Sequence, residues 1–307
     1  MTTTARQRGV ARRHYRFSRA LSLAAMRTAI RAWRRLDPGA ISRSWTAEGV
    51  GADLHGTLFI AKRRAAAEAT PYLDEFLGEP AALGQFRVRP EAWADEAADG
   101  RRLDRLLLQP AIRALADQRD GAPPREAMRA GEVSLARLIQ SEIQAAGRSA
   151  DQVEMATRPQ VTGYTRMLNP PSCGRCVILA GRFYRWSEGF ERHPNCDCIQ
   201  VPAEEAPESG ELVDPAEAVR KGQVNGLSRA DEEAILAGAD PSQVINAHNG
   251  MFTLDGLKYT RTGTTRRGLA GQRLQGARRL RPEAIFRLAG DDRQEALRLL
   301  HLHGFII

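Results

Sequence analysis

The chain has 307 residues, of which only 6% are aromatic, so we expect several small hydrophobic cores rather than a single large one. Its formal net charge is +8, almost all of it arginine, which favours an acidic partner, although a GC-rich coding sequence also raises arginine and alanine content. No stretch approaches the roughly 20 apolar residues of a membrane-spanning helix, and the arginine-rich start lacks the pattern of a secretory signal, so we expect no membrane span and a reducing cytoplasm.

Residues 14–35 predict an amphipathic helix. The apolar residues that define one face of this helix are Leu23, Met26, Ile30 and Trp33. Ten arginines precede the first acidic residue, Asp37. The basic face is therefore either a solvated helix surface or a docking surface for DNA or an acidic protein.

The rest of the first half predicts further helices joined by short polar breaks. Asp-Pro-Gly marks a break over 36–45, and a helix follows over 57–80. Another helix is expected from Pro90 to about residue 115, with an interruption near Gly100. A loop at 119–124 leads into a helix over 125–157 whose apolar side is Leu135, Leu138, Ile139 and Ile143.

The pattern changes near residue 160. Glycine, a Pro-Pro pair and β-branched residues replace the helical periodicity, and the short segments GRFYRW and CIQVP predict strands. We therefore predict an α+β protein in three regions. These are a mostly helical region over 1–157, a small central α+β module with a zinc knuckle over 158–204, and a region with a short hairpin and helices over 205–307.

The last hundred residues carry clear helix and turn signals. Ser228 with Asp231 predicts a capped helix, and Asp240 before a proline predicts the start of another. Asp255-Gly256 predicts a tight hairpin over 251–260. Two more helices are expected, one from Pro282 to Gly290 and one from Asp292 to Gly304.

All four cysteines and one histidine lie in a single short stretch. The spacing is Cys173-x2-Cys176, then His193-x2-Cys196-x-Cys198. A C-x2-C pair brings two sulfurs to one metal ion, and a second knuckle completes a tetrahedron, which suits a structural zinc. Five candidate ligands compete for four places, so His193 is either a ligand or a donor to one. Nearby arginines that offset the charge of the thiolates are Arg175, Arg182, Arg185 and Arg192.

Three other interpretations of this stretch stay open. Two disulfides would form if the protein ends outside the cell. A catalytic Cys-His pair is a second alternative, although nothing singles out one nucleophile. A catalytic zinc with an open position is a third, in which His193 and Asp197 would act, although no H-E-x-x-H motif accompanies them.

The stretch MLNPPSCGRCVILAGRFYRWSEGFERHPNCDCIQVP resembles the core of phage minor head proteins of the Mu F-like family, in versions from actinobacterial tailed phages and prophages. The positions that match the motif of that family are Cys173, Cys176, Gly181, Tyr184, His193, Cys196, Cys198 and Pro202. The N-terminal helix and the segments ADPSQVINAHNGM, GTTRRGLAGQRL and AGDDRQEALRLLHLHGFI also resemble that family. Residues 80–150 show no specific resemblance.

The resemblance implies a structural, non-enzymatic minor capsid protein that acts in head morphogenesis. Its implied partners are the portal protein, other capsid proteins and packaged DNA, through the basic helix at 12–35 and TTRRG at 264–268. It would be found in the virion, and in the host cytoplasm during assembly. Two alternatives remain: a DNA-binding zinc module, and a zinc-dependent hydrolase or capsid maturation protease.

Overall fold

The computed structural model describes residues 4–80, 87–186, 198–203, 213–248, 251–254, 257–260, 269–275, 277–280, 282–290, 292–304 and 306. The contacts group the chain into two compact units. The first unit contains residues 1–165 and 183–206, and the second contains 166–182 and 207–307. The three regions expected from the sequence stay a prediction. None of the described helices is long and apolar enough to cross a membrane.

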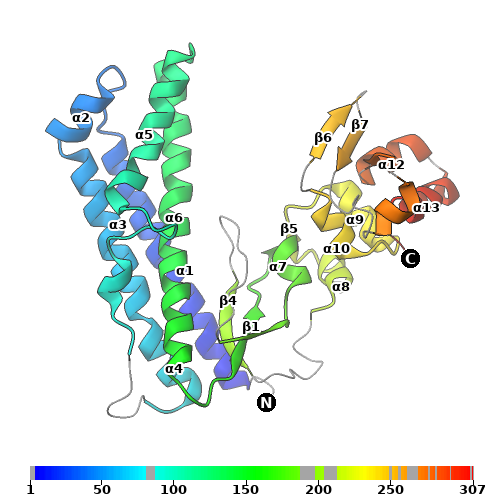
Figure 1. The fold of residues 1–307 in the computed structure, drawn as a ribbon, viewed down its shortest axis with the longest axis horizontal. Coiled ribbons are helices and arrows are strands. Elements are labelled where there is room, and N and C mark those ends of the chain that lie inside the picture. Colours follow the sequence, from blue (N-terminus) through cyan, green and yellow to red (C-terminus); the bar gives the residue numbers. More distant parts are fainter. Residues whose placement is uncertain are drawn as a thin grey trace. The chain divides into compact units, whose positions relative to one another are not determined.

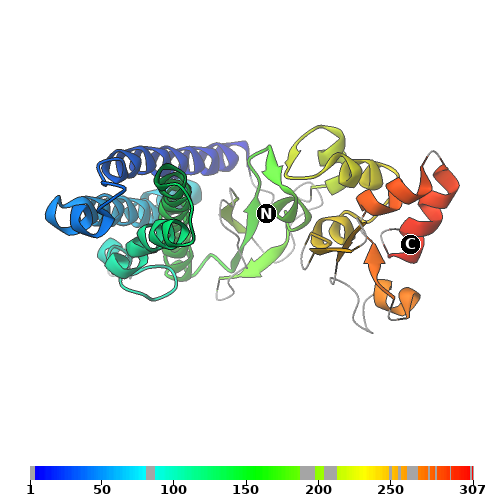
Figure 2. The same ribbon diagram turned by 90° about the horizontal axis from the view of Figure 1, so that it is seen from above.

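The first unit is mostly helical, which confirms the expectation for the N-terminal half (Figure 1). Its helices are α1 (Ala5–Trp33), α2 (Ile41–Ala47), α3 (Val50–Ala67), α4 (Ala69–Leu77), the short 3-10 helix η1 (Pro90–Trp93), α5 (Leu103–Arg119) and α6 (Pro124–Ala156). Helices α1, α3, α4 and α5 all contact α6, so the longest helix is the central member of the bundle (Figures 1 and 2).

Several details of the first half differ from the prediction. The helix expected over 57–80 is two helices, because α3 begins earlier, at Val50, and ends at Ala67, and α4 follows from Ala69. The expected break at 36–45 is shorter, because α2 already begins at Ile41. The helix expected from Pro90 is only the short η1, and an irregular segment separates it from α5. In α1, Leu23 is 39% exposed, whereas the alanines Ala25 and Ala29 are buried, because small side chains let neighbouring helices approach closely.

Trp33 anchors the core between α1 and α6. Its indole Nε1 donates a hydrogen bond to the carbonyl oxygen of Met128 at 3.1 Å, and its side chain is 1% exposed. The ring lies against Gly131, where a Cβ atom would come within 2.4 Å of Trp33 Cζ2. A glycine is therefore required at this point of α6 for the two helices to pack around the indole.

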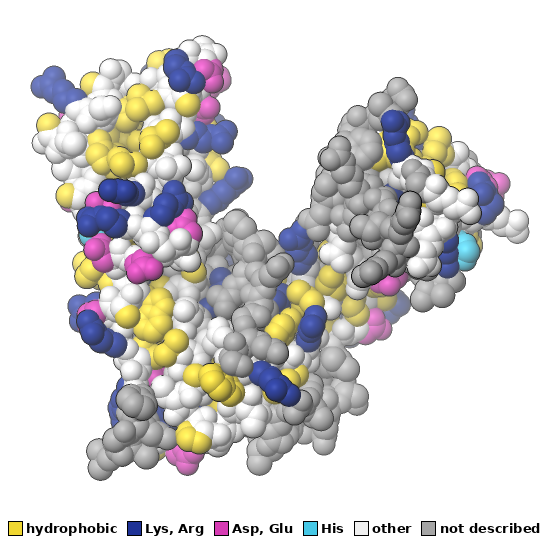
Figure 3. Space-filling view, viewed as in Figure 1, with side chains coloured by type: hydrophobic (Ala, Val, Ile, Leu, Met, Phe, Trp, Pro, Cys, Tyr) yellow, Lys and Arg dark blue, Asp and Glu magenta, His cyan; other side chains and the backbone are white. Residues whose placement is uncertain are grey.

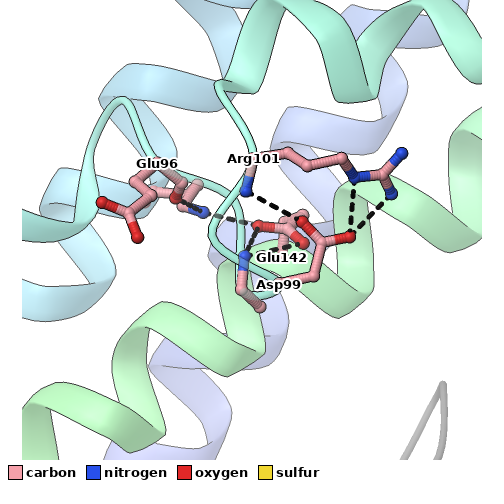
Figure 4. A network of polar contacts seen from close by, with 6 residues as sticks. Glu96, Asp99, Arg101 and Glu142 are labelled. Carbon is pink, nitrogen blue, oxygen red and sulfur yellow. Dashed lines mark hydrogen bonds and ion pairs between the residues drawn. The ribbon is translucent and has the colours of Figure 1, made fainter.

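A buried lysine joins α3 to α6 and to the segment before α5. Lys62 Nζ donates to Glu142 Oε2 at 2.5 Å and to the carbonyl oxygen of Glu96 at 2.6 Å. The backbone N–H of Ala98 also donates to Glu142, at 3.0 Å (Figure 4). The irregular segment between η1 and α5 is thus tied to two distant helices, in addition to hydrogen bonds within the segment itself, and contacts of that range leave no local sequence signal.

A second buried acid of α6 joins α4 to Arg158, which lies two residues beyond the end of α6. Glu154 is fully buried and accepts hydrogen bonds from Arg158 Nη2 at 2.7 Å and from Thr70 Oγ1 at 2.9 Å. Arg158 also forms an ion pair with Asp74 of α4. The charged groups are paired, as buried charges must be to offset the loss of hydration.

A three-stranded sheet packs on the bundle of the first unit. Its strands are β1 (Gly163–Met167), β3 (Phe183–Arg185) and β4 (Ile199–Ala203), in the order β3-β1-β4. Strand β4 contacts α1 and α6, and the hydroxyl of Tyr72 in α4 donates to the carbonyl oxygen of Gln200 at 2.9 Å. The strands predicted from GRFYRW and CIQVP are confirmed.

The second unit consists of short elements. They are β2 (Ser172–Cys173), α7 (Gly174–Ile178), α8 (Pro215–Arg220), β5 (Val224–Asn225), α9 (Arg229–Leu236), α10 (Pro241–Asn246), β6 (Met251–Leu254), β7 (Leu257–Thr260), α11 (Leu269–Leu274), β8 (Arg279–Leu280), α12 (Pro282–Ala289) and α13 (Arg293–Leu302). Strands β6 and β7 pair antiparallel and β7 pairs with β8, which confirms the two strands of the predicted hairpin, whereas Asp255-Gly256 lies outside the described residues. The capping box of Ser228 with Asp231 and the N-caps Asp240 and Asp292 are also confirmed.

Candidate metal centre

The first knuckle of the predicted zinc site lies at the start of α7 in the second unit. Cys173 ends β2 and is the N-cap of α7, and its Sγ accepts a hydrogen bond from the backbone N–H of Cys176 at 3.4 Å. The extended conformation of Cys173 followed directly by the helix places both cysteines in one turn of chain. An N–H group aimed at sulfur stabilises negative charge there, which suits a thiolate ligand.

Cys176 is fully buried and has a cationic neighbour. The Nη1 atom of Arg166, at the end of β1, donates to Cys176 Sγ at 3.8 Å. A guanidinium beside a buried sulfur favours the thiolate form, which is the form that binds metal. Arg166 was not among the arginines expected to offset the charge. Its signal in the sequence was weak: a charged residue inside a strand of otherwise buried residues.

The backbone around the knuckle is fixed by short-range packing within the second unit. Strand β2 pairs with β5, and the N–H of Ser172 donates to the carbonyl oxygen of Gln223 at 2.9 Å. At Gly174, a Cβ atom would come within 3.1 Å of the Ile245 side chain in α10. The segment between Ser172 and Cys176 is thus held against β5 and α10.

The remaining predicted ligands are not all described. His193 and Cys196 lie outside the described residues. Cys198 belongs to the first unit, where it is buried and its carbonyl oxygen accepts from Arg148 Nη1 at 3.4 Å. Among the described residues, no group of three or more His, Cys, Asp or Glu side chains is placed to bind a metal ion. The pair Cys173 and Cys176 fits half of a zinc site, and the other half stays a prediction.

A second buried polar cluster lies in the first unit, where α1, α4 and α6 meet. His14 Nε2 lies 2.9 Å from Asp151 Oδ2, and the imidazole stacks on the ring of Tyr72 with centroids 4.0 Å apart. Burial lowers the pKa of His14, but the charge of Asp151 and its hydrogen bond outweigh burial, so the net pKa is raised. A cavity of about 20 Å³, large enough for one water molecule, borders both side chains.

Two surfaces of the first unit stand out. On α5, the exposed apolar residues Leu108, Ile112 and Leu115 follow one another at steps of four and three, so they form a stripe on one face. Their exposed fractions are 36%, 51% and 40%. Figure 3 shows apolar side chains gathered over the part of the bundle where α5 lies. On α1, the exposed residues are mainly arginines.

Comparisons with known proteins add no family to this picture. The chain matches no protein-family model, no curated protein and no solved structure.

Proposed function

We propose that this chain is a non-enzymatic minor capsid protein of a tailed phage or prophage, associated with the portal and other capsid proteins during head assembly. It would act in the host cytoplasm and remain in the virion. The observation that supports an assembly role is the apolar stripe on α5, formed by Leu108, Ile112 and Leu115. Large apolar side chains that share one exposed face mark a surface for another protein.

The identity of the partner rests on the resemblance of the cysteine-rich stretch to Mu F-like proteins. Proteins of that family associate with the portal. The stripe lies on a helix that is packed along α3 and α6, so its side chains are presented by a preformed surface and little ordering is needed on binding.

The association is tested by co-expression of the tagged chain with the portal protein of the same phage. Ile112→Asp places a charge at the centre of the stripe and is expected to reduce co-purification of the portal at least tenfold. Leu236→Asp is the matched control, because Leu236 is equally exposed, at 52%, but lies in the second unit. Equal co-purification of portal with the wild type and with Ile112→Asp would refute this role of α5.

We further propose that a zinc ion has a structural role in this protein. Cys173 and Cys176 would bind it together with two of His193, Cys196 and Cys198. When bound, zinc contributes folding free energy to a region of short elements, and four protein ligands leave no open position for a substrate. The backbone N–H donated to Cys173 and the guanidinium beside Cys176 support thiolates at both positions.

Metal analysis of the purified, reduced chain tests this proposal, with one zinc ion per chain expected. The variant Cys173→Ser/Cys176→Ser is expected to lose the metal and the folded state of the second unit. Thiol titration of the denatured wild type separates zinc from disulfides, because zinc binding leaves all four cysteines titratable. A double variant that folds normally without metal would contradict a structural zinc.

A further inference from the structure

The outward face of α1 carries a line of arginines. At about 100° per residue, the positions of these arginines fall within an arc of about 120°, opposite the buried face of the helix. The members of this arginine line are Arg12, Arg16, Arg19, Arg27 and Arg31, and all five are exposed. Its first and last members are 19 residues apart, which corresponds to about 28 Å along the helix axis.

The arginine line makes few of the polar contacts that hold the described part of the chain together. Among the described residues, none of its five members forms an ion pair with a carboxylate, whereas their neighbours Arg13 and Arg34 are paired with Glu75 and Glu132. Two members make only local bonds: Arg16 donates to the carbonyl oxygen of Arg12, and Arg31 donates to Thr28 Oγ1. There is no acidic residue in the whole of α1, so no negative charge on this helix offsets the positive electrostatic potential of the arginine line.

The chemistry of this face favours a phosphate backbone over a protein surface. Protein interfaces have apolar centres from which charged residues are depleted. On this face of α1, the one exposed large apolar side chain is Leu23, and Ile30 within the same arc is half-buried. Interfaces with DNA are instead polar and strongly positive. Each guanidinium presents a fork of N–H donors that matches phosphate oxygens. A length of about 28 Å corresponds to about 8 base pairs at 3.4 Å per pair.

We propose that the arginine line of α1 binds the phosphate backbone of double-stranded DNA without sequence preference. This inference rests on the proposed function in one respect only, which is that the DNA bound would be the packaged genome. The arginine line lies on α1 and the apolar stripe on α5. The variant Ile112→Asp is therefore expected to keep its affinity for DNA while its co-purification with the portal is reduced. Failure of either proposal can therefore be recognised without the other.

The test measures binding of the full chain to a labelled 20-base-pair duplex of random sequence at several sodium chloride concentrations. If each member of the line contacts one phosphate, the line contributes about −4.5 to the slope of log K against log salt, or a loss of about 500-fold between 50 and 200 mM. The line variant, in which all five arginines of the arginine line are replaced by glutamine, is expected to lose this contribution. Glutamine keeps the helix propensity, so the fold is expected to be retained.

The control variant replaces five exposed arginines elsewhere by glutamine. These are Arg105, Arg113, Arg119, Arg220 and Arg229, and both variants lower the formal net charge from +8 to +3. The control is expected to keep most of the wild-type slope. Equal losses in the two variants would overturn the proposal, because net charge alone would then explain binding. Binding to poly-glutamate, a stand-in for an acidic protein surface, is measured with the same variants. If the five-arginine variant loses binding to poly-glutamate but keeps binding to the duplex, the proposal is overturned in favour of an acidic protein partner.

Discussion

The buried pair of Lys62 and Glu142 gives a quantitative test of how the first unit is held together. The variant Lys62→Met removes the charge but keeps a straight side chain of similar length. It leaves Glu142 with only the N–H of Ala98 as a donor and removes the lysine donor to the carbonyl oxygen of Glu96. Because Lys62 is 2% exposed, water cannot easily replace the lost partner.

The expected loss of unfolding free energy is about 3–5 kcal/mol, the range found when one partner of a buried ion pair is removed. The double variant Lys62→Met/Glu142→Leu removes both charges. It leaves Ala98 N–H and the Glu96 carbonyl without these partners, at about 1–3 kcal/mol each, but it also removes the cost of burying two charges. The double variant is therefore expected to be more stable than Lys62→Met alone.

Tryptophan fluorescence is a suitable assay, because all four tryptophans, at positions 33, 45, 93 and 186, lie in the first unit. Urea unfolding followed by this signal reports on the bundle and not on the second unit. The control is Arg102→Met, which removes one partner of an exposed ion pair with Asp104 and is expected to leave the midpoint unchanged. The pair does not stabilise the bundle in this way if Lys62→Met shifts the midpoint no more than Arg102→Met. The same holds if the double variant loses as much as the single variants Lys62→Met and Glu142→Leu added together.

Three further predictions concern stability. Gly131→Ala is expected to destabilise the first unit by about 1–3 kcal/mol, because its Cβ would meet Trp33. Gly56→Ala has open space at its Cβ and is expected to be neutral or stabilising, and the urea midpoints of the two variants are compared. Burial and nearby arginines lower the pKa of His303 to about 4, below its ordinary 6.5, so the second unit is expected to lose stability as the pH falls from 6.5 to 4. Hydrogen exchange in α13 measures this loss, which is expected to be absent in His303→Gln. The pKa of His14 is raised, so its contribution is present below pH 6.5 and is lost as the pH rises through that raised value; a pH series of tryptophan-detected unfolding should lose this dependence in His14→Gln.

The elements that the sequence predicts well are those whose signals are local. The helix over 125–157 has a 3.6-residue repeat, and Leu135, Ile139 and Ile143 are buried as expected. Helix caps such as Ser228 with Asp231 depend on residues three positions apart, and the hairpin depends on one dipeptide. Such features need no knowledge of the rest of the fold.

The features that were missed depend on contacts between distant residues. The segment between η1 and α5 is not helical: Glu142 of α6 accepts from the N–H of Ala98 across 44 positions of sequence, and Glu96 pairs with Arg102 in an isolated bridge. The buried face of α1 is set by close packing against α3 and α6, which favours alanine over the larger Leu23. In the metal centre, the x2 spacing predicted the turn from Cys173 to Cys176, but not the guanidinium of Arg166.

The buried acids of α6 explain how a bundle rich in alanine reaches one arrangement. Alanine faces pack closely but distinguish poorly between one register and the next, because the side chains are small and alike. Glu142, Asp151 and Glu154 lie at different heights of α6, and their cationic partners are Lys62 of α3, His14 of α1 and Arg158. A shift of α1 or α3 by one turn, about 5.4 Å, would separate these pairs and leave charges buried without a partner. The pairs therefore fix where α1 stands along α6, and with it the position of the arginine line.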